Sequence, residues 1–90
     1  MHRLRIDDFR WPKGIEEKIL RKHGFYADEV EESFFHPEGK LRKESDRCRL
    51  FSRTYSGDYI IVIFEYAVRI VTIISAREMA SSEKHLFRRK

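Results

Sequence analysis

Alternating and continuous apolar positions in the second half of the chain predict a β-meander. Residues alternate in character over Arg47–Tyr55, which indicates a strand with one buried and one polar face. Ser56–Asp58 gives a tight-turn signal, and Tyr59–Phe64 is apolar on both faces, as in a central strand that is covered on both sides. A further strand over Arg69–Ser75 returns after a turn near Tyr66–Ala67. These segments predict three antiparallel strands.

Helical spacing dominates the first half of the chain. Leu4–Phe9 first alternates in the manner of a short strand. Trp11–Pro12 then opens a helix, because proline is tolerated in a first helical turn, and Gly24 ends it. A second helix is expected over Ala27–Phe35, where four acids suit the positive end of the helix dipole. A docking face for a basic partner is the alternative explanation of these acids.

A short edge strand and a last helix complete the predicted elements. Residues 40–46 are charged, and lysine and arginine there discourage pairing between sheet edges. The last helix begins near Ser81–Ser82 and is expected to direct Leu86 and Phe87 inward. The elements predict one α+β domain over residues 1–90, with two N-terminal helices, an antiparallel sheet of three to four strands and a C-terminal helix.

Charge is unevenly distributed along the chain. Residues 69–90 hold six lysines and arginines against two acids, so this segment carries the whole formal net charge of +4. Residues 1–68 hold 13 residues of each sign and are neutral. A basic patch attracts polyanions such as RNA or DNA. The alternative is an ordinary solvated helix that turns Lys84, Arg88 and Arg89 outward.

The remaining composition narrows the class of protein. Cys48 is the single cysteine, which excludes an internal disulfide framework and fits a reducing compartment. No cysteine–histidine cluster has zinc-ligand spacing, so neither a metal nor a cofactor is expected. The longest apolar run, Tyr59–Phe64, is too short to cross a bilayer, and the N-terminus lacks the apolar stretch of a signal peptide. We therefore expect a cytoplasmic protein with no membrane partner.

Six segments carry a resemblance to a known family. They are Phe9–Arg10–Trp11, Arg21–Lys22–His23–Gly24, Ala27–Phe35, Arg53–Thr54 with Gly57, Ile73–Met79, and Glu83. In this order, and over nearly the whole chain, they resemble the BrnT family of type II toxins. The resemblance implies a RelE-like fold and metal-independent cleavage of RNA, in which a 2′-hydroxyl attacks the neighbouring phosphate.

The same resemblance implies partners. They are RNA and an antitoxin of the ribbon-helix-helix type, in a homodimer or a toxin–antitoxin heterotetramer. Two departures from the family pattern keep an alternative open: Pro12 replaces the usual aspartate, and Val71–Thr72 occupies the stretch where an arginine is usual. The alternative is a catalytically inactive relative that binds RNA or a partner. DNA binding through the C-terminal helix is a third hypothesis, against which no helix-turn-helix pattern has credible spacing.

The implied chemistry selects four candidate catalytic residues. It needs a group that takes the hydroxyl proton and cations that hold the charge developing on the phosphate. His23 is assigned the proton transfer, because imidazole ionises nearest to neutral pH, and Arg53 and Arg77 are assigned the charge stabilisation. Lys22 is the fourth candidate. As structural alternatives, Lys22 and His23 complement a helix dipole, and Arg77 forms a salt bridge with Glu83.

Six further residues are candidates for RNA binding. Three alternate on one face of the predicted strand at Arg47–Tyr55, where cations and aromatic rings together suit single-stranded RNA. The other three come from the basic C-terminal segment. For the strand arginines, ion pairs with acids on a neighbouring strand are the alternative. The candidates are Arg49, Phe51, Tyr55, Arg69, Lys84 and Arg88.

Overall fold

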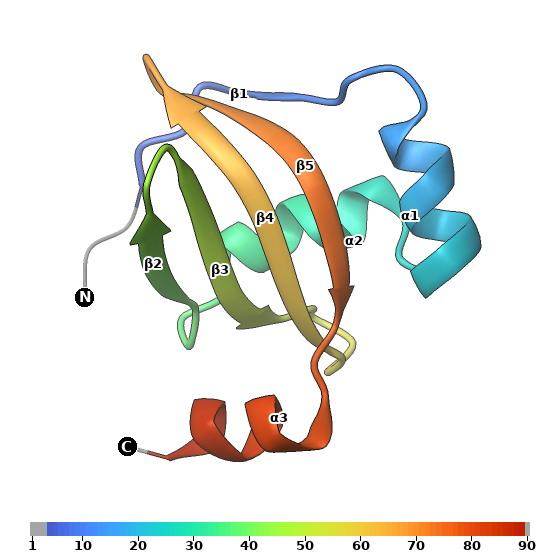
Figure 1. Ribbon diagram of the computed structural model, residues 1–90, viewed down its shortest axis with the longest axis vertical. Coiled ribbons are helices and arrows are strands. Elements are labelled where there is room, and N and C mark those ends of the chain that lie inside the picture. Colours follow the sequence, from blue (N-terminus) through green and yellow to red (C-terminus); the bar gives the residue numbers. More distant parts are fainter. Residues whose placement is uncertain (1–3, 90) are drawn as a thin grey trace.

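The computed structural model describes residues 4–89 and is built around one five-stranded β-sheet (Figure 1). Lys90, which belongs to the basic C-terminal segment, lies outside the described residues, as do residues 1–3. The elements follow the chain as β1 (Asp8–Arg10), α1 (Ile15–His23), α2 (Ala27–Glu32), the short 3₁₀ helix η1 (Ser33–Phe35), β2 (Lys40–Glu44), β3 (Arg47–Arg53), β4 (Tyr59–Ala67), β5 (Ile70–Glu78) and α3 (Ser81–Arg88).

The sheet has the strand order β1-β5-β4-β3-β2. The strands from β2 to β5 form an antiparallel meander, with Leu50 opposite Val62 and Val62 opposite Ala76. β1 pairs with β5 in parallel, with Phe9 opposite Val71. The predicted α+β class is confirmed, with two helices before the antiparallel meander and one after it. The sheet has one strand more than expected, and that strand is parallel.

The first strand is shorter than the apolar alternation predicted. Leu4 and Ile6 pack against the core from irregular chain and belong to no strand. The N–H of Asp7 donates to the carbonyl of Arg69 at 2.7 Å, immediately before β1 begins. The chain therefore reaches the edge of β5 only at this point, and three residues are left to pair.

Backbone conformation sets the ends of the first helix. α1 begins at Ile15 instead of Trp11, because Gly14 has a left-handed φ of 86° and cannot belong to the helix. Gly24 ends the helix as predicted, with φ at 77° and its N–H donating to the carbonyl of Leu20 at 2.9 Å. Trp11 lies before the helix, and its indole N–H donates to a carboxylate oxygen of Glu31 at 2.8 Å.

Two other boundaries differ from the prediction. The second predicted helix divides into α2 and η1, where the hydroxyl of Ser33 donates to the carbonyl of Val30 at 2.6 Å. The turn between β4 and β5 lies at Val68 and Arg69, two residues later than predicted, and both residues have a positive φ. β4 and β5 therefore extend to nine residues each.

The helices α1 and α2 cover one face of the sheet. Ile19 of α1 and Val30 of α2 pack in one cluster with Val62, Phe64 and Ile73 of the sheet. The aromatic ring of Phe64 in this cluster is fully buried. This cluster is the main hydrophobic core.

The helix α3 packs against the opposite face, which we call the α3 face. Phe87 forms a second cluster there with Ile61 and Met79. Figure 1 shows α3 at the end of the sheet where β5 finishes, with the β4–β5 turn at the opposite end. Phe87 is buried as predicted, whereas Leu86, which was also predicted to point inward, is 62% exposed. Neighbouring residues of a helix point about 100° apart, so a two-turn helix cannot bury both on one flat sheet face.

A buried hydrogen bond joins β3 to the 3₁₀ helix, and its removal should destabilise the fold. The hydroxyl of Ser52 donates to the carbonyl of Ser33 at 2.7 Å, and both residues are fully buried. We expect Ser52→Ala to lower the free energy of unfolding by about 1–3 kcal/mol, because a buried carbonyl loses a donor. Urea denaturation measures this change. Ser82→Ala, at an exposed position of α3, is the matched control and should change stability by less than about 0.5 kcal/mol. Equal effects of the two substitutions would contradict the assignment.

Candidate functional site

The α3 face gathers cations from three strands. In the sheet register, Arg42 of β2 lies opposite Arg49 of β3, and Arg77 of β5 lies opposite Ile61 of β4. Side chains at directly opposed positions point to the same face. This face therefore carries Lys40, Arg42, Arg49, Arg53 and Arg77.

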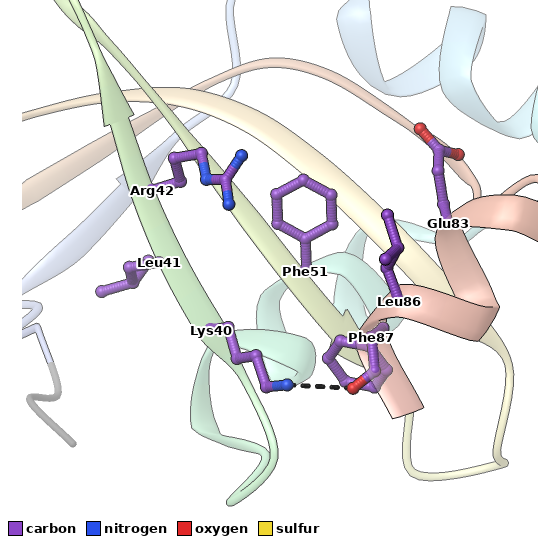
Figure 2. A pocket seen from close by; sticks show the side chains of 7 residues that line it. All are labelled: Lys40, Leu41, Arg42, Phe51, Glu83, Leu86 and Phe87. Carbon is purple, nitrogen blue, oxygen red and sulfur yellow. Dashed lines mark hydrogen bonds between the residues drawn. The ribbon is translucent and has the colours of Figure 1, made fainter. Parts of the chain in front are cut away.

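Two adjoining grooves run between the sheet and α3. Figure 2 shows the first, of about 540 Å³, where Lys40 and Arg42 point toward Phe51 and the helix. The second, of about 590 Å³, adds cations from the C-terminal segment to those of the sheet. Its lining includes Lys40, Arg53, Tyr59, Phe87, Arg88 and Arg89.

Lys40 and Phe87 stand between the two grooves. The Lys40 ammonium donates to the carbonyl of Phe87 at 2.9 Å, and it lies 5.1 Å from the centre of the Phe87 ring (Figure 2). The contact satisfies a carbonyl in the last turn of α3, where a cation also suits the helix dipole. Lys40 therefore helps to hold the helix on the sheet.

A bidentate ion pair fixes the start of α3 to β5. The two terminal guanidinium nitrogens of Arg77 donate to the two carboxylate oxygens of Glu83 at 2.9 and 2.8 Å. The hydrogen bonds from Arg77 and from the N–H of Ala80 lower the pKa of Glu83 to about 2. The same pairing raises the pKa of Arg77 above its ordinary value. The predicted salt bridge between these two residues is confirmed, and it engages the arginine that was assigned to transition-state stabilisation.

Arg53 lies at the centre of the second groove. Its guanidinium lies 4.7 Å from the centre of the Tyr59 ring, and Nη2 donates to the carbonyl of Gly57 at 3.2 Å. Nη1 lies 3.7 Å from the carboxylate of Glu38. Its Nε is buried and has no hydrogen-bond partner among residues 4–89. The guanidinium is thus positioned by an aromatic ring and retains an unsatisfied donor.

His23 lies at the end of the sheet where β5 finishes. Its Nδ1 lies 2.9 Å from a carboxylate oxygen of Glu78. His23 lines a smaller groove of about 290 Å³ with Tyr59 and Lys84, and Tyr59 also lines the groove of Arg53. The structure therefore brings His23, Lys84 and Arg53 to surfaces that share one aromatic ring. Lys22 is exposed in the last turn of α1.

The other strand and helix candidates lie on or beside the α3 face. Phe51 is half-buried in the first groove, and Arg88 lines the second. Lys84 lies 5.6 Å from the centre of the Tyr59 ring. Arg49 pairs with Glu44 of the neighbouring strand at 3.2 Å, which confirms the ion-pair alternative for this arginine.

Two predicted RNA-binding residues lie apart from the grooves. β3 ends at Arg53, so Tyr55 belongs to the following turn, where its N–H donates to Glu32 of α2 at 2.9 Å. Tyr55 therefore does not continue the alternation of the strand, contrary to the expectation. Arg69 lies in the β4–β5 turn, at the opposite end of the sheet from Arg77.

The predicted site did not include the groove cations Lys40, Arg42 and Arg89, nor the ring of Tyr59. The signal for Arg42 was present in the sequence. A two-residue turn at Ser45–Asp46 closes the β2–β3 hairpin and places Arg42 opposite Arg49. Because the predicted edge strand ran to residue 46, it left no turn before Arg47 and did not give this register.

Two further features concern metals and membranes. Across residues 4–89, the structure contains no group of three or more histidine, cysteine, aspartate or glutamate residues that could hold a metal ion. Within the same range, every helix is too short or too polar to cross a membrane.

The fold has a counterpart among solved structures. It is similar to the crystal structure of the ribonuclease toxin BrnT from Brucella abortus, with a TM-score of 0.66 and 19% sequence identity. The similarity covers 82% of this chain and 97% of that chain. No family model matches the sequence, and no curated protein matches it significantly. The chain therefore has a BrnT-type toxin fold.

Acid should remove the contribution of the Arg77–Glu83 pair to stability. The pKa of Glu83 is lowered from 4.5 to about 2 in the folded chain. Its stabilisation is therefore fully present above pH 4.5 and is lost as the pH falls toward 2. We expect Glu83→Gln to cost about 1 kcal/mol at neutral pH, since the pair is partly exposed, and almost nothing near pH 2.

Urea denaturation of both proteins across this pH range measures the difference. Glu16→Gln, on the exposed side of α1, is the matched control and should show no such convergence. A Glu83→Gln deficit that stays constant in acid would contradict the assignment.

Proposed function

We propose that this chain is the ribonuclease toxin of a type II toxin–antitoxin pair, and that it cuts RNA beside α3. The observation that carries the proposal is the BrnT-type fold, which aligns with nearly the whole of the Brucella ribonuclease toxin. The cations of the α3 face support it, because neutralising phosphates is the main source of affinity for RNA. The aromatic rings of Phe51 and Tyr59 border the same grooves and can stack on unpaired bases.

The proposed reaction is attack of a 2′-hydroxyl on the neighbouring phosphate, without a metal. The bond from phosphorus to the 5′-oxygen breaks, so that a 2′,3′-cyclic phosphate forms and the departing 5′-oxygen takes up a proton from solvent. His23 is the candidate for taking the hydroxyl proton. When Nδ1 carries a hydrogen bonded to Glu78, Nε2 keeps the lone pair that accepts this proton. The carboxylate also stabilises the imidazolium that forms. This pairing is the arrangement that a general base of this kind needs.

The reaction also requires cations that stabilise the negative charge developing on the phosphate. Arg53 supports this role, because its guanidinium is held over Tyr59 and its side chain, which is 32% exposed, lines the second groove. Lys84 lies in the groove of His23 and supplies a second cation. Arg77 is bound to Glu83 through both terminal nitrogens, so in this arrangement it orders the helix that carries Lys84. Arg49, Arg88 and Lys22 then bind the flanking phosphates.

The inactive-relative hypothesis rests on a specific observation. Arg77, one of the two arginines expected to act on the transition state, has both terminal nitrogens engaged by Glu83. Thr72 lies opposite Glu65 of β4, five residues before Arg77 on the same strand, and contributes no cation. Under this second candidate function, the α3 face binds RNA or a protein partner and performs no cleavage.

A toxin of this type requires an antitoxin, and the BrnT-type fold supports the expectation of such a partner. A ribbon-helix-helix antitoxin, a heterotetramer or homodimer, and a cytoplasmic location belong to the proposal as well. An open reading frame for a short ribbon-helix-helix protein next to this gene is the first observation to seek. Growth arrest on expression, relieved by that neighbour, is the second.

An RNA-cleavage assay tests the proposed chemistry. We expect cleavage of a single-stranded RNA in the presence of EDTA, with 2′,3′-cyclic phosphate ends, and no cleavage when the scissile 2′-hydroxyl is replaced by hydrogen. Arg53→Gln should slow cleavage by about 10²–10³-fold, as the loss of one transition-state donor does. His23→Gln should slow it by about 10²–10⁴-fold and flatten the pH–rate profile.

The matched control is Arg69→Gln, at the far end of the sheet, which should slow cleavage by less than about threefold by weakening RNA binding alone. Equal cleavage by the wild-type protein and the Arg53→Gln variant would contradict the role given to Arg53, and no cleavage by the wild-type protein would exclude the enzyme. Salt-dependent RNA binding without cleavage would instead establish the inactive-relative function.

A further inference from the structure

The outer edge of β2 is the second chemically distinctive surface of the molecule. β2 ends the sheet, and its five residues are all exposed. Within residues 4–89, no other strand pairs with its outer side. An exposed edge presents unpaired backbone N–H and C=O groups, which can pair with an extended segment of another chain.

The register shows which backbone groups face outward. Glu44 and Arg47 flank the two-residue turn and lie opposite each other. In so short a hairpin the two flanking residues exchange backbone hydrogen bonds. Hydrogen-bonded and non-hydrogen-bonded pairs alternate along an antiparallel ladder. The backbone groups of Glu44 and Arg42 therefore bond to β3, and those of Leu41 and Lys43 point away from the sheet.

Each face of the sheet has a groove beside this edge. On the α3 face, Lys40 and Arg42 border the first groove. Figure 2 shows the side chain of Leu41 pointing to the opposite side of the strand from these two cations. On the face of α1 and α2, Leu41 borders a groove of about 500 Å³ that is also lined by Leu4, Cys48 and Phe64. An added strand would thus meet the cations Lys40 and Arg42 on one face, and on the other the apolar side chain of Leu41 next to Lys43.

We propose that the edge of β2 binds an extended peptide segment in which acidic and apolar residues alternate, and that this segment adds to the sheet as a sixth strand. Successive side chains of a strand point to opposite faces, so the acids would face Lys40 and Arg42 while the apolar residues would lie beside Leu41. The main chain would pair with the N–H and C=O groups of Leu41 and Lys43. The proposal goes beyond RNA cleavage and requires neither RNA binding nor catalysis.

A second copy of the chain fits this edge less well than an acidic segment. β2 holds three cations against the single carboxylate of Glu44, so two β2 strands would bring like charges together. In a symmetric antiparallel pair of two β2 strands centred on Arg42, the Arg42 side chains of the two copies would lie opposite each other. Charge complementarity therefore selects a partner strand that is acidic on the side facing the cations.

Titration calorimetry with the full chain tests the proposal. The probe is an eight-residue peptide with blocked ends in which glutamate and valine alternate. A peptide of the same composition, with its four glutamates before its four valines, measures non-specific attraction. We expect the alternating peptide to bind at least about tenfold more tightly, because only alternation separates acids and apolar groups onto opposite faces.

Two variants at one position separate the backbone contact from charge. Lys43→Pro removes a backbone N–H that points away from the sheet, and it leaves the hydrogen bonds between β2 and β3 intact. Proline is tolerated at a sheet edge. Lys43→Gln is the matched control, since it removes the same charge and keeps the N–H. We expect Lys43→Pro to weaken binding at least about tenfold further than Lys43→Gln. Equal affinities of the two variants would overturn strand addition.

Hydrogen exchange on the wild-type protein gives a measurement that depends on no variant. The alternating peptide should slow exchange at the amides of Leu41 and Lys43, and it should change α3 little. Three outcomes would each overturn the proposal. The first is protection from exchange that is confined to α3. The second is binding of oligouridylate, in place of the peptide, at the amides of Leu41 and Lys43, and the third is a dimer that Lys43→Pro abolishes. RNA cleavage by the Lys43→Pro variant, measured separately, distinguishes loss of this surface from loss of the proposed enzyme activity.

Discussion

Strand β4 is buried on both of its faces, and the rest of the structure depends on this double burial. Ile60, Val62 and Phe64 point toward α1 and α2, whereas Ile61 points toward α3, and none of the four has any exposed surface. Burying one such side chain contributes about 1.5–3 kcal/mol, so both faces of the sheet must be covered. Two helices cover the first face. The single short helix α3 covers only part of the second, and the uncovered part forms the grooves.

The contacts that hold α3 are largely polar, because the helix is short and buries one large side chain. Glu83 accepts hydrogen bonds from Arg77 and from the N–H of Ala80, and Lys40 donates to the carbonyl of Phe87 at the other end. These contacts distinguish two cations of the sheet from two cations of the helix. Arg77 and Lys40 hold the helix in place, while Lys84 and Arg88 are carried by the helix and make no side-chain hydrogen bond within residues 4–89. The groups that position the helix are thus distinct from those that it presents to a ligand.

The sequence could predict the central strands because their signal is local. The period-two pattern of β3, the turn at Gly57 and the apolar run of β4 lie within about twenty consecutive residues, and the meander follows from their order. The Arg77–Glu83 pair could also be predicted from the sequence, because only a strand end and one helical turn separate the two residues. The short first strand was predicted from its alternation, but its parallel pairing was not, since β1 pairs with a strand about sixty positions away and a local pattern does not say which strand it joins. The same limit applies to the candidate site, because Arg53, Tyr59 and His23 come to adjoining grooves only through tertiary packing.

The charge count along the chain also differs from the charge distribution in space. Residues 1–68 are neutral in sum, but four of their cations, Lys40, Arg42, Arg49 and Arg53, gather on the α3 face. The acids of α2, among them Glu29, Glu31 and Glu32, lie in the layer behind the sheet, whereas Arg42 and Arg53 stand on the α3 face. The basic C-terminal helix then adds its cations to the face that is already positive. A polyanion approaching the molecule is therefore drawn to the α3 face, an orientation that the net charge of +4 alone does not provide.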